Sequence, residues 1–160
     1  MKASLPVPAM TTGTRPTTYD TDFYTWTQEQ AELLRQGRFA DVDLENVIEE
    51  LETLGRSEYN SLVSAIHRLT QHLLKWQYQP ERRVSGNPSW EITINNQRDV
   101  IRQVIDDSPG LKNKLAEAIQ TGYRRGRRDA QTETRLPLST FPETCPYSWE
   151  ELIDEGWLPD

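Results

Sequence analysis

The sequence is short of the residues from which cross-links and metal sites are commonly built. It holds one cysteine, Cys145, and two histidines, so the chain can form no internal disulfide and has no Cys/His zinc spacing. It also lacks the run of about 18 apolar residues that a membrane-spanning helix needs. Neither a glycine-rich phosphate loop nor a Gly-x-Ser-x-Gly motif is present. The disulfide-rich and membrane-spanning classes are therefore excluded, and no standard catalytic motif remains.

Acidic residues outnumber basic residues in the chain. Its 160 residues include 25 Asp and Glu against 18 Lys and Arg, a net charge of -7, and the length suits one domain. Only 35% of the residues are hydrophobic, but five tryptophans and six tyrosines supply large surfaces to bury. A single cysteine is typical of a reducing compartment, and Met1-Lys2-Ala3 is followed by prolines and threonines rather than an apolar signal core. We therefore expect a soluble, cytoplasmic protein with a flexible N-terminal arm, 1–18, and a single helical domain, 19–160.

Apolar residues recur every three to four positions, which is the period of an amphipathic α-helix. The longest such stretch runs from Asp43 to Gln79 and keeps its phase through Gly55. This predicts one long helix, with two helices broken at Gly55 as the alternative. Its predicted core stripe comprises Leu44, Ile48, Leu51, Leu62, Ile66, Leu69, Leu73 and Trp76.

Residues typical of helix caps predict where the other helices begin and end. We expect one over residues 19–36, capped by Asp20 or Thr21 and ended by Gly37, and another that begins at Ser89. A third begins at Pro109 and reaches about residue 131, with Gly122 and Gly126 allowing a close neighbour, and a short one covers residues 149–154. The predicted fold is all-α: an antiparallel helical bundle of about four main helices with a short C-terminal helix.

Several short motifs occur together in this order: Asp22-Phe23-Tyr24-x-Trp26, Glu49-Glu50-Leu51-Glu52-x-Leu54-Gly55, His72-Leu73-Leu74-Lys75-Trp76, Pro80-Glu81-Arg82-Arg83, Ser89-Trp90, Gln97-Arg98 and Phe141-Pro142-x-x-Cys145-Pro146-Tyr147. As a set they resemble the domain-of-unknown-function family twenty-nine, an all-helical family common in photosynthetic bacteria. The resemblance covers roughly residues 19–159. It implies a single helical domain and brings no activity with it.

Three glutamates form the first candidate site. Glu45, Glu49 and Glu52 stand at i, i+4 and i+7 of the long predicted helix, so they share one face. Three carboxylates on one face could hold Mg²⁺ or Mn²⁺ or carry out acid–base chemistry. A solvated acidic face gives the same pattern, and that interpretation is favoured because it is the default for a surface helix.

Histidine and buried polar positions give the next candidates. His67 and His72 are five residues apart and point away from each other, so they cannot bind one metal. His67 is expected to point to the outside of the helix, and His72, at the border of the apolar stripe, is the better candidate base. Glu58 falls inside the apolar stripe and needs a partner, for which Arg56, Arg98 or Arg102 would serve. An interhelical polar clamp is favoured there over a binding cleft. If a catalytic centre exists, its candidates are His72, Glu49 and Arg98.

The remaining candidates are a basic cluster and the lone thiol. Arg124, Arg125, Arg127 and Arg128 could bind nucleic acid, but residues 136–160 hold six acids and no base, so we expect that segment to pair with these arginines instead. Cys145 has no neighbouring base to activate it and is expected to be structural.

Together these patterns favour a non-enzymatic protein-interaction module that associates with itself or with another protein. The alternative is a metal-dependent hydrolase or nuclease that uses the acidic face of the second helix with His72. A lower-ranked hypothesis is a nucleic-acid-associated regulator that uses the arginine cluster. No cofactor and no membrane partner are predicted.

Overall fold

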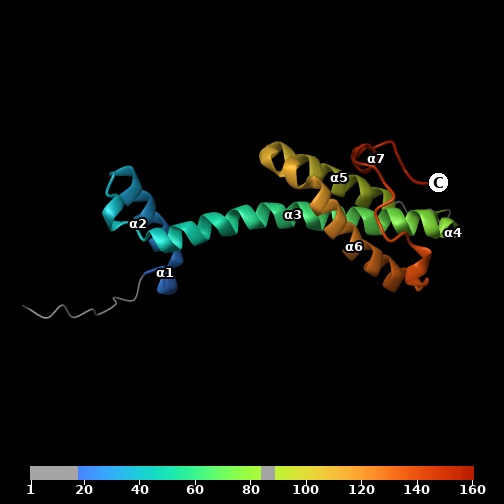
Figure 1. Ribbon diagram of the computed structural model, residues 1–160, viewed down its shortest axis with the longest axis horizontal. Coiled ribbons are helices and arrows are strands. Elements are labelled where there is room, and N and C mark those ends of the chain that lie inside the picture. The colour runs from blue at the N-terminus through green and yellow to red at the C-terminus, as the bar shows by residue number, and fades with distance from the viewer. Residues whose placement is uncertain (1–17, 84–88) are drawn as a thin grey trace, which may run out of the picture. The chain divides into compact units, whose positions relative to one another are not determined.

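The structure is a computed structural model that describes residues 18–83 and 89–160, and every regular element in these two ranges is helical (Figure 1). The all-α prediction is confirmed. Four long helices are present in the described part of the chain, α2 (Phe23–Arg35), α3 (Leu44–Tyr78), α5 (Ser89–Asp107) and α6 (Leu115–Thr134), together with the short C-terminal α7 (Trp149–Ile153). The arm predicted over residues 1–18 lies, except for Thr18, outside the described residues.

The described residues divide into two compact units, a first unit of residues 18–52 and a second unit of residues 53–83 and 89–160, and α3 contributes residues to both. This division does not test whether residues 19–160 form a single domain, so the single domain stays a prediction. No helix of the described residues is long and apolar enough to cross a membrane.

The first unit contains α1 (Thr18–Thr21), α2, the 3₁₀-helix η1 (Phe39–Asp41) and the start of α3. The cap of α2 is Asp22, whose carboxylate accepts from the backbone N–H of Thr25 at 3.0 Å, so the expectation of Asp20 or Thr21 was wrong. The reason is that Asp20 and Thr21 belong to the separate turn α1. Gly37 follows the end of α2 with φ of 69°, a left-handed conformation that suits glycine, as expected.

The buried centre of the first unit is small. Trp26 is buried with its ring against those of Tyr19 and Phe23, and its indole N–H donates to Asp43 at 3.2 Å. The buried Gln30 accepts from the backbone N–H of Asp43 at 2.8 Å. These bonds join α2 to the residue that precedes α3.

Helix α3 runs without interruption through Gly55, as the favoured interpretation predicted. A Cβ at Gly55 would meet no atom within 4 Å, because this part of the helix is open to solvent. The missing side chain therefore weakens the helix only through backbone entropy, a cost of roughly 1 kcal/mol that flanking helical residues absorb.

The second unit is built around the C-terminal half of α3. Leu62, Ile66, Leu69 and Leu73 are fully buried there, each contributing about 1.5–3 kcal/mol through removal from water. Helices α5, α6 and α7 and the segment between α6 and α7 supply the rest of this core, with buried residues that include Ile94, Ile101, Ala118, Tyr123, Ala130, Phe141, Tyr147 and Leu152.

Glycine brings α6 against α3, which it crosses in Figure 1. A Cβ built on Gly126 would lie 2.5 Å from Thr70 Oγ1 and 2.8 Å from the carbonyl oxygen of His67, so only glycine fits this contact. Gly122 makes a similar approach to Ile66. The close approach expected at these two glycines is therefore present. The predicted helix from Pro109 begins as a 3₁₀-helix, η2 (Pro109–Lys114), and becomes α-helical at Leu115.

The apolar stripe of α3 is buried along only part of its length. Leu44, Ile48 and Leu51 are 62%, 48% and 63% exposed, although the sequence placed them in the core with Leu62 and Ile66. The core cluster of buried side chains contains no α3 residue before Leu62 among the described residues, so nothing in it covers the earlier positions. Glu58 is exposed for the same reason, and the buried clamp predicted for it was wrong.

Candidate functional site

The glutamates proposed as metal ligands lie in the first unit. Glu45, Glu49 and Glu52 are all exposed on the first turns of α3. The neighbouring Glu50 has a defined partner: it accepts the hydroxyl of Tyr19 at 2.7 Å, and this bond, with the nearby negative charge, raises the pKa of Tyr19 to about 12. No group of three His, Cys, Asp or Glu side chains close enough to hold a metal ion occurs within residues 18–83 and 89–160.

Beside these carboxylates lies a row of exposed apolar side chains. Leu44, Ile48 and Leu51 occupy one side of α3 at i, i+4 and i+7, and Glu45, Glu49 and Glu52 follow each of them by one position. We call these six residues the α3 stripe. Because one residue corresponds to a rotation of about 100°, the carboxylates form an acidic edge along the apolar row. An apolar row with a charged edge is suited to pack against another protein surface.

His72, the candidate base, lies in the second unit and is half-buried. Its Nδ1 donates to the backbone oxygen of Arg68 at 2.9 Å, which leaves Nε2 as the ring position able to accept a proton. Burial lowers the pKa of His72 below its usual value, so the ring is neutral at pH 7. A neutral imidazole ring can act as a base. Arg98, the other catalytic candidate of this unit, instead uses its guanidinium group to bind backbone carbonyls.

Arg98 is fully buried and fixes the C-terminal segment of the chain. Its Nε donates to the carbonyl of Leu152 at 3.0 Å, and its Nη2 donates to those of Glu151 at 3.2 Å and Trp157 at 2.8 Å. The first two carbonyls belong to the last turn of α7, where carbonyl groups have no partner within the helix. Arg98 therefore caps α7 and ties it to α5, and burial lowers its pKa below the usual value for arginine.

Sequence reasoning missed the pairing of His67 across two helices. His67 was placed on the outside of its helix, but its Nε2 lies 2.7 Å from Oδ2 of Asp129 on α6. Gly126 touches the backbone of His67, and Asp129 stands about one turn further along α6 on the same side. The glycine pair indicated that a neighbour packs against this side of α6, but nothing in the sequence indicated that the neighbour carries His67.

The basic cluster separates into two kinds of arginine. Arg127 is half-buried and donates to the carbonyls of Leu138 and Phe141 at 3.0 Å. Arg124, Arg125 and Arg128 are exposed, and none of their side chains makes a hydrogen bond or ion pair with a described residue. The C-terminal segment does lie against Arg127, but it offers carbonyl groups, so the acidic pairing expected from the sequence is not what holds it.

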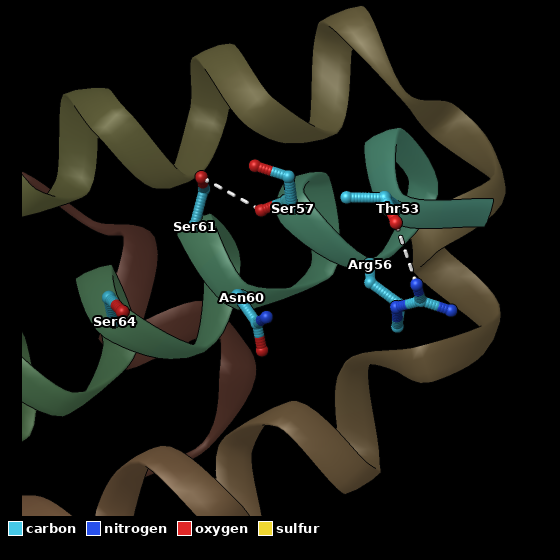
Figure 2. A pocket seen from close by; sticks show the side chains of 6 residues that line it. All are labelled: Thr53, Arg56, Ser57, Asn60, Ser61 and Ser64. Atoms are coloured by element: carbon cyan, nitrogen blue, oxygen red, sulfur yellow. Dashed lines mark hydrogen bonds between the residues drawn. The ribbon is translucent and has the colours of Figure 1, made fainter. Parts of the chain in front are cut away.

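A shallow polar hollow follows the exposed side of α3 in the second unit (Figure 2). All of its lining belongs to this one helix, and Arg56 donates within it to Thr53 Oγ1 at 2.7 Å. None of the candidate site residues lines it. The lining residues are Thr53, Arg56, Ser57, Asn60, Ser61 and Ser64.

Cys145 is half-buried, and its thiol donates weakly to the backbone oxygen of Tyr147 at 3.7 Å. Burial raises the pKa of this thiol above its usual value, which reduces the thiolate fraction at neutral pH. We expect iodoacetamide to alkylate Cys145 in the native protein several-fold more slowly than in the urea-unfolded chain at the same pH. Mass spectrometry of timed samples measures both rates, and equal rates would contradict the protected, inactive thiol described here.

The fold and these contacts define an all-helical protein whose first unit exposes an apolar row with an acidic edge. The sequence model of the family described as "Domain of unknown function DUF29" matches residues 18–158. The chain therefore belongs to this family, as its motifs indicated. No curated protein matches the chain, and no solved structure does.

Proposed function

We propose that this protein is a non-enzymatic interaction module that associates with a second copy of itself through the α3 stripe. The observation that carries the proposal is the exposure of Leu44, Ile48 and Leu51, which continue the same helical period as the buried Leu62 and Ile66. Scattered exposed leucines need no explanation, but a contiguous apolar row rimmed by charge marks an interaction surface.

The charge distribution supports a second copy as the partner. Residues 18–52 hold ten Asp and Glu against two arginines, whereas residues 53–160 are almost balanced and hold arginines without a described partner. One molecule thus carries both signs of charge on different units, and two copies can complement each other. No contact within the described residues favours the alternative of a metal-dependent hydrolase, and the expected cytoplasmic location stays a prediction.

Ile48→Lys tests this proposal. Lysine keeps the helix but places a charge in the middle of the apolar row, so self-association should weaken at least about tenfold, or about 1.4 kcal/mol. Light scattering after size-exclusion chromatography, repeated over a wide range of protein concentration, measures the effect. The matched control is Ile92→Lys, which changes an isoleucine of similar exposure, 53%, on α5 of the second unit.

The control variant should associate as the unmodified protein does. A protein that stays monomeric at every concentration, or a loss of association that is equal in the two variants, would remove the proposal.

A further inference from the structure

Three exposed arginines on α6 form a surface that the fold itself does not use. Arg124, Arg125 and Arg128 lie within little more than one helical turn, and their side chains make no hydrogen bond or ion pair with any residue of the described ranges. We call them the α6 arginine face. Most other arginines of the second unit are engaged, for example Arg98 and Arg127 with backbone carbonyls. Because unsatisfied charges of one sign lie close together here, the surface is ready for an anionic partner.

The packing of α6 fixes the direction of this face. Gly122 and Gly126 contact α3, and Arg124 and Arg128 each follow one of these glycines by two positions. A step of two residues turns the helix by about 200°, so both arginines point away from α3. Their Cα atoms are separated by about 6 Å along the axis, as expected for an i, i+4 pair. Glu117, the acid at the start of α6, is already paired with Lys114 at 3.2 Å.

The first unit offers the matching geometry with opposite charge. Both of its described arginines are paired within the unit, Arg35 with Glu32 and Arg38 with Asp41. Glu45 and Glu49 are exposed on the acidic edge of the α3 stripe and are likewise an i, i+4 pair, about 6 Å apart along the helix. Two helices that lie side by side can therefore align both glutamates with both arginines.

We infer that the α6 arginine face of one molecule binds the α3 stripe of a second copy, with Glu45 and Glu49 opposite Arg124 and Arg128. The inference rests on the proposed function and names the surface that receives the stripe. Arginine suits this contact because its aliphatic stem covers apolar side chains while its guanidinium stays at the charged edge. The stripe supplies the apolar row for those stems and the carboxylates for the guanidinium groups.

The contact joins two different surfaces, so it is heterologous. A dimer formed in this way leaves one α3 stripe and one arginine face unoccupied, and further copies can add to them. Association should therefore continue past the dimer as concentration rises. It should also weaken as salt is added, because exposed ion pairs are screened.

Charge reversal on both surfaces tests the inference. The first variant is Arg124→Glu with Arg128→Glu, and the second is Glu45→Lys with Glu49→Lys. Each variant alone opposes like charges across the proposed contact, so the dissociation constant for self-association should rise at least about tenfold. In an equimolar mixture every contact between the two variants is again between opposite charges. The mixture should therefore recover complexes that neither variant forms alone, as sedimentation velocity would show.

A matched control reverses two other exposed cations, Arg68→Glu with Lys112→Glu, and should leave self-association unchanged. If the unmodified protein associates and Ile48→Lys prevents this, but the charge variants behave as the control does, the inference is wrong while the proposed function stands. A monomeric unmodified protein would overturn both. Tight binding of a duplex or single-stranded DNA oligonucleotide that is lost in Arg124→Glu with Arg128→Glu, without mixing rescue, would assign the face to nucleic acid and overturn the inference.

Discussion

Replacement of Arg98 by methionine is expected to lower the free energy of unfolding by about 3–5 kcal/mol, which is large for one side chain. Methionine has a similar length but donates no hydrogen bond, so the carbonyls of Glu151, Leu152 and Trp157 lose their donor. An unsatisfied buried carbonyl costs roughly 1–3 kcal/mol. Water reaches some of these groups once α7 loosens, which limits the total. Urea unfolding followed by circular dichroism measures the loss.

Two companion variants separate the capping role of Arg98 from its charge. Arg98→Lys keeps the charge, but a single ammonium group cannot reach carbonyls on both sides of α7, so its stability should lie between those of the unmodified protein and Arg98→Met. Arg102→Met removes the exposed pairs with Asp99 and Glu155 and one hydrogen bond to the carbonyl of Ile153 at 3.0 Å, so it should cost only about 1 kcal/mol, less than Arg98→Met. Hydrogen exchange should also quicken over residues 148–158 in Arg98→Met. Full stability of the lysine variant would show that the planar guanidinium is not required.

A second large effect is expected at the contact between α3 and α6. Gly126→Ala should destabilise the protein by about 2–4 kcal/mol, because its new Cβ would lie 2.5 Å from Thr70 Oγ1, 2.8 Å from the carbonyl oxygen of His67 and 2.9 Å from the backbone nitrogen of Gln71. Two of these atoms are backbone, so the contact can be relieved only by moving one helix. The gain of about 1 kcal/mol in helix propensity offsets part of the cost.

The same substitution at Gly55 provides the control and should have the opposite sign. Gly55 lies inside α3 with open space around its Cβ position, so Gly55→Ala should stabilise the protein by about 0.5–1 kcal/mol. Thermal and urea unfolding of the two variants measure the contrast directly. Destabilisation by both substitutions would mean that glycine is needed in α3 for another reason, and stabilisation by both would mean that the two helices are not in close contact.

The two glycines show how far sequence reasoning reached. Their spacing predicted that a neighbour approaches α6, and the structure confirms it, with α3 as the neighbour. The identity of the neighbour could not be predicted, because helical periodicity specifies which side of a helix is apolar but not which other helix covers it. For this reason His67 was placed on the outside and its contact with Asp129 was missed.

Arg98 illustrates a different limit. The sequence places Arg98 beside Gln97 in the amphipathic helix that begins at Ser89, and a charged residue on such a helix is a reasonable catalytic candidate. Apart from the side-chain oxygen of Asn95 at 3.3 Å, its partners lie more than 50 residues away in the chain, and they are backbone carbonyls, which every residue possesses. No side-chain pattern marks a carbonyl as a ligand for arginine, so this role becomes visible only in three dimensions.

The sequence by itself determined the all-α fold class of this protein and the family to which the chain belongs, because these depend on local periodicity and on motifs. It favoured an uninterrupted α3 but left a break at Gly55 open, and the structure decided between the two. The tertiary structure alone decided which part of the apolar row of α3 is buried. Leu51 and Leu62 have the same side chain and similar places in the helical period, yet one is 63% exposed and the other is fully buried. The difference arises because burial requires a covering element, and the side chains that supply this cover come from parts of the chain far from α3 in sequence.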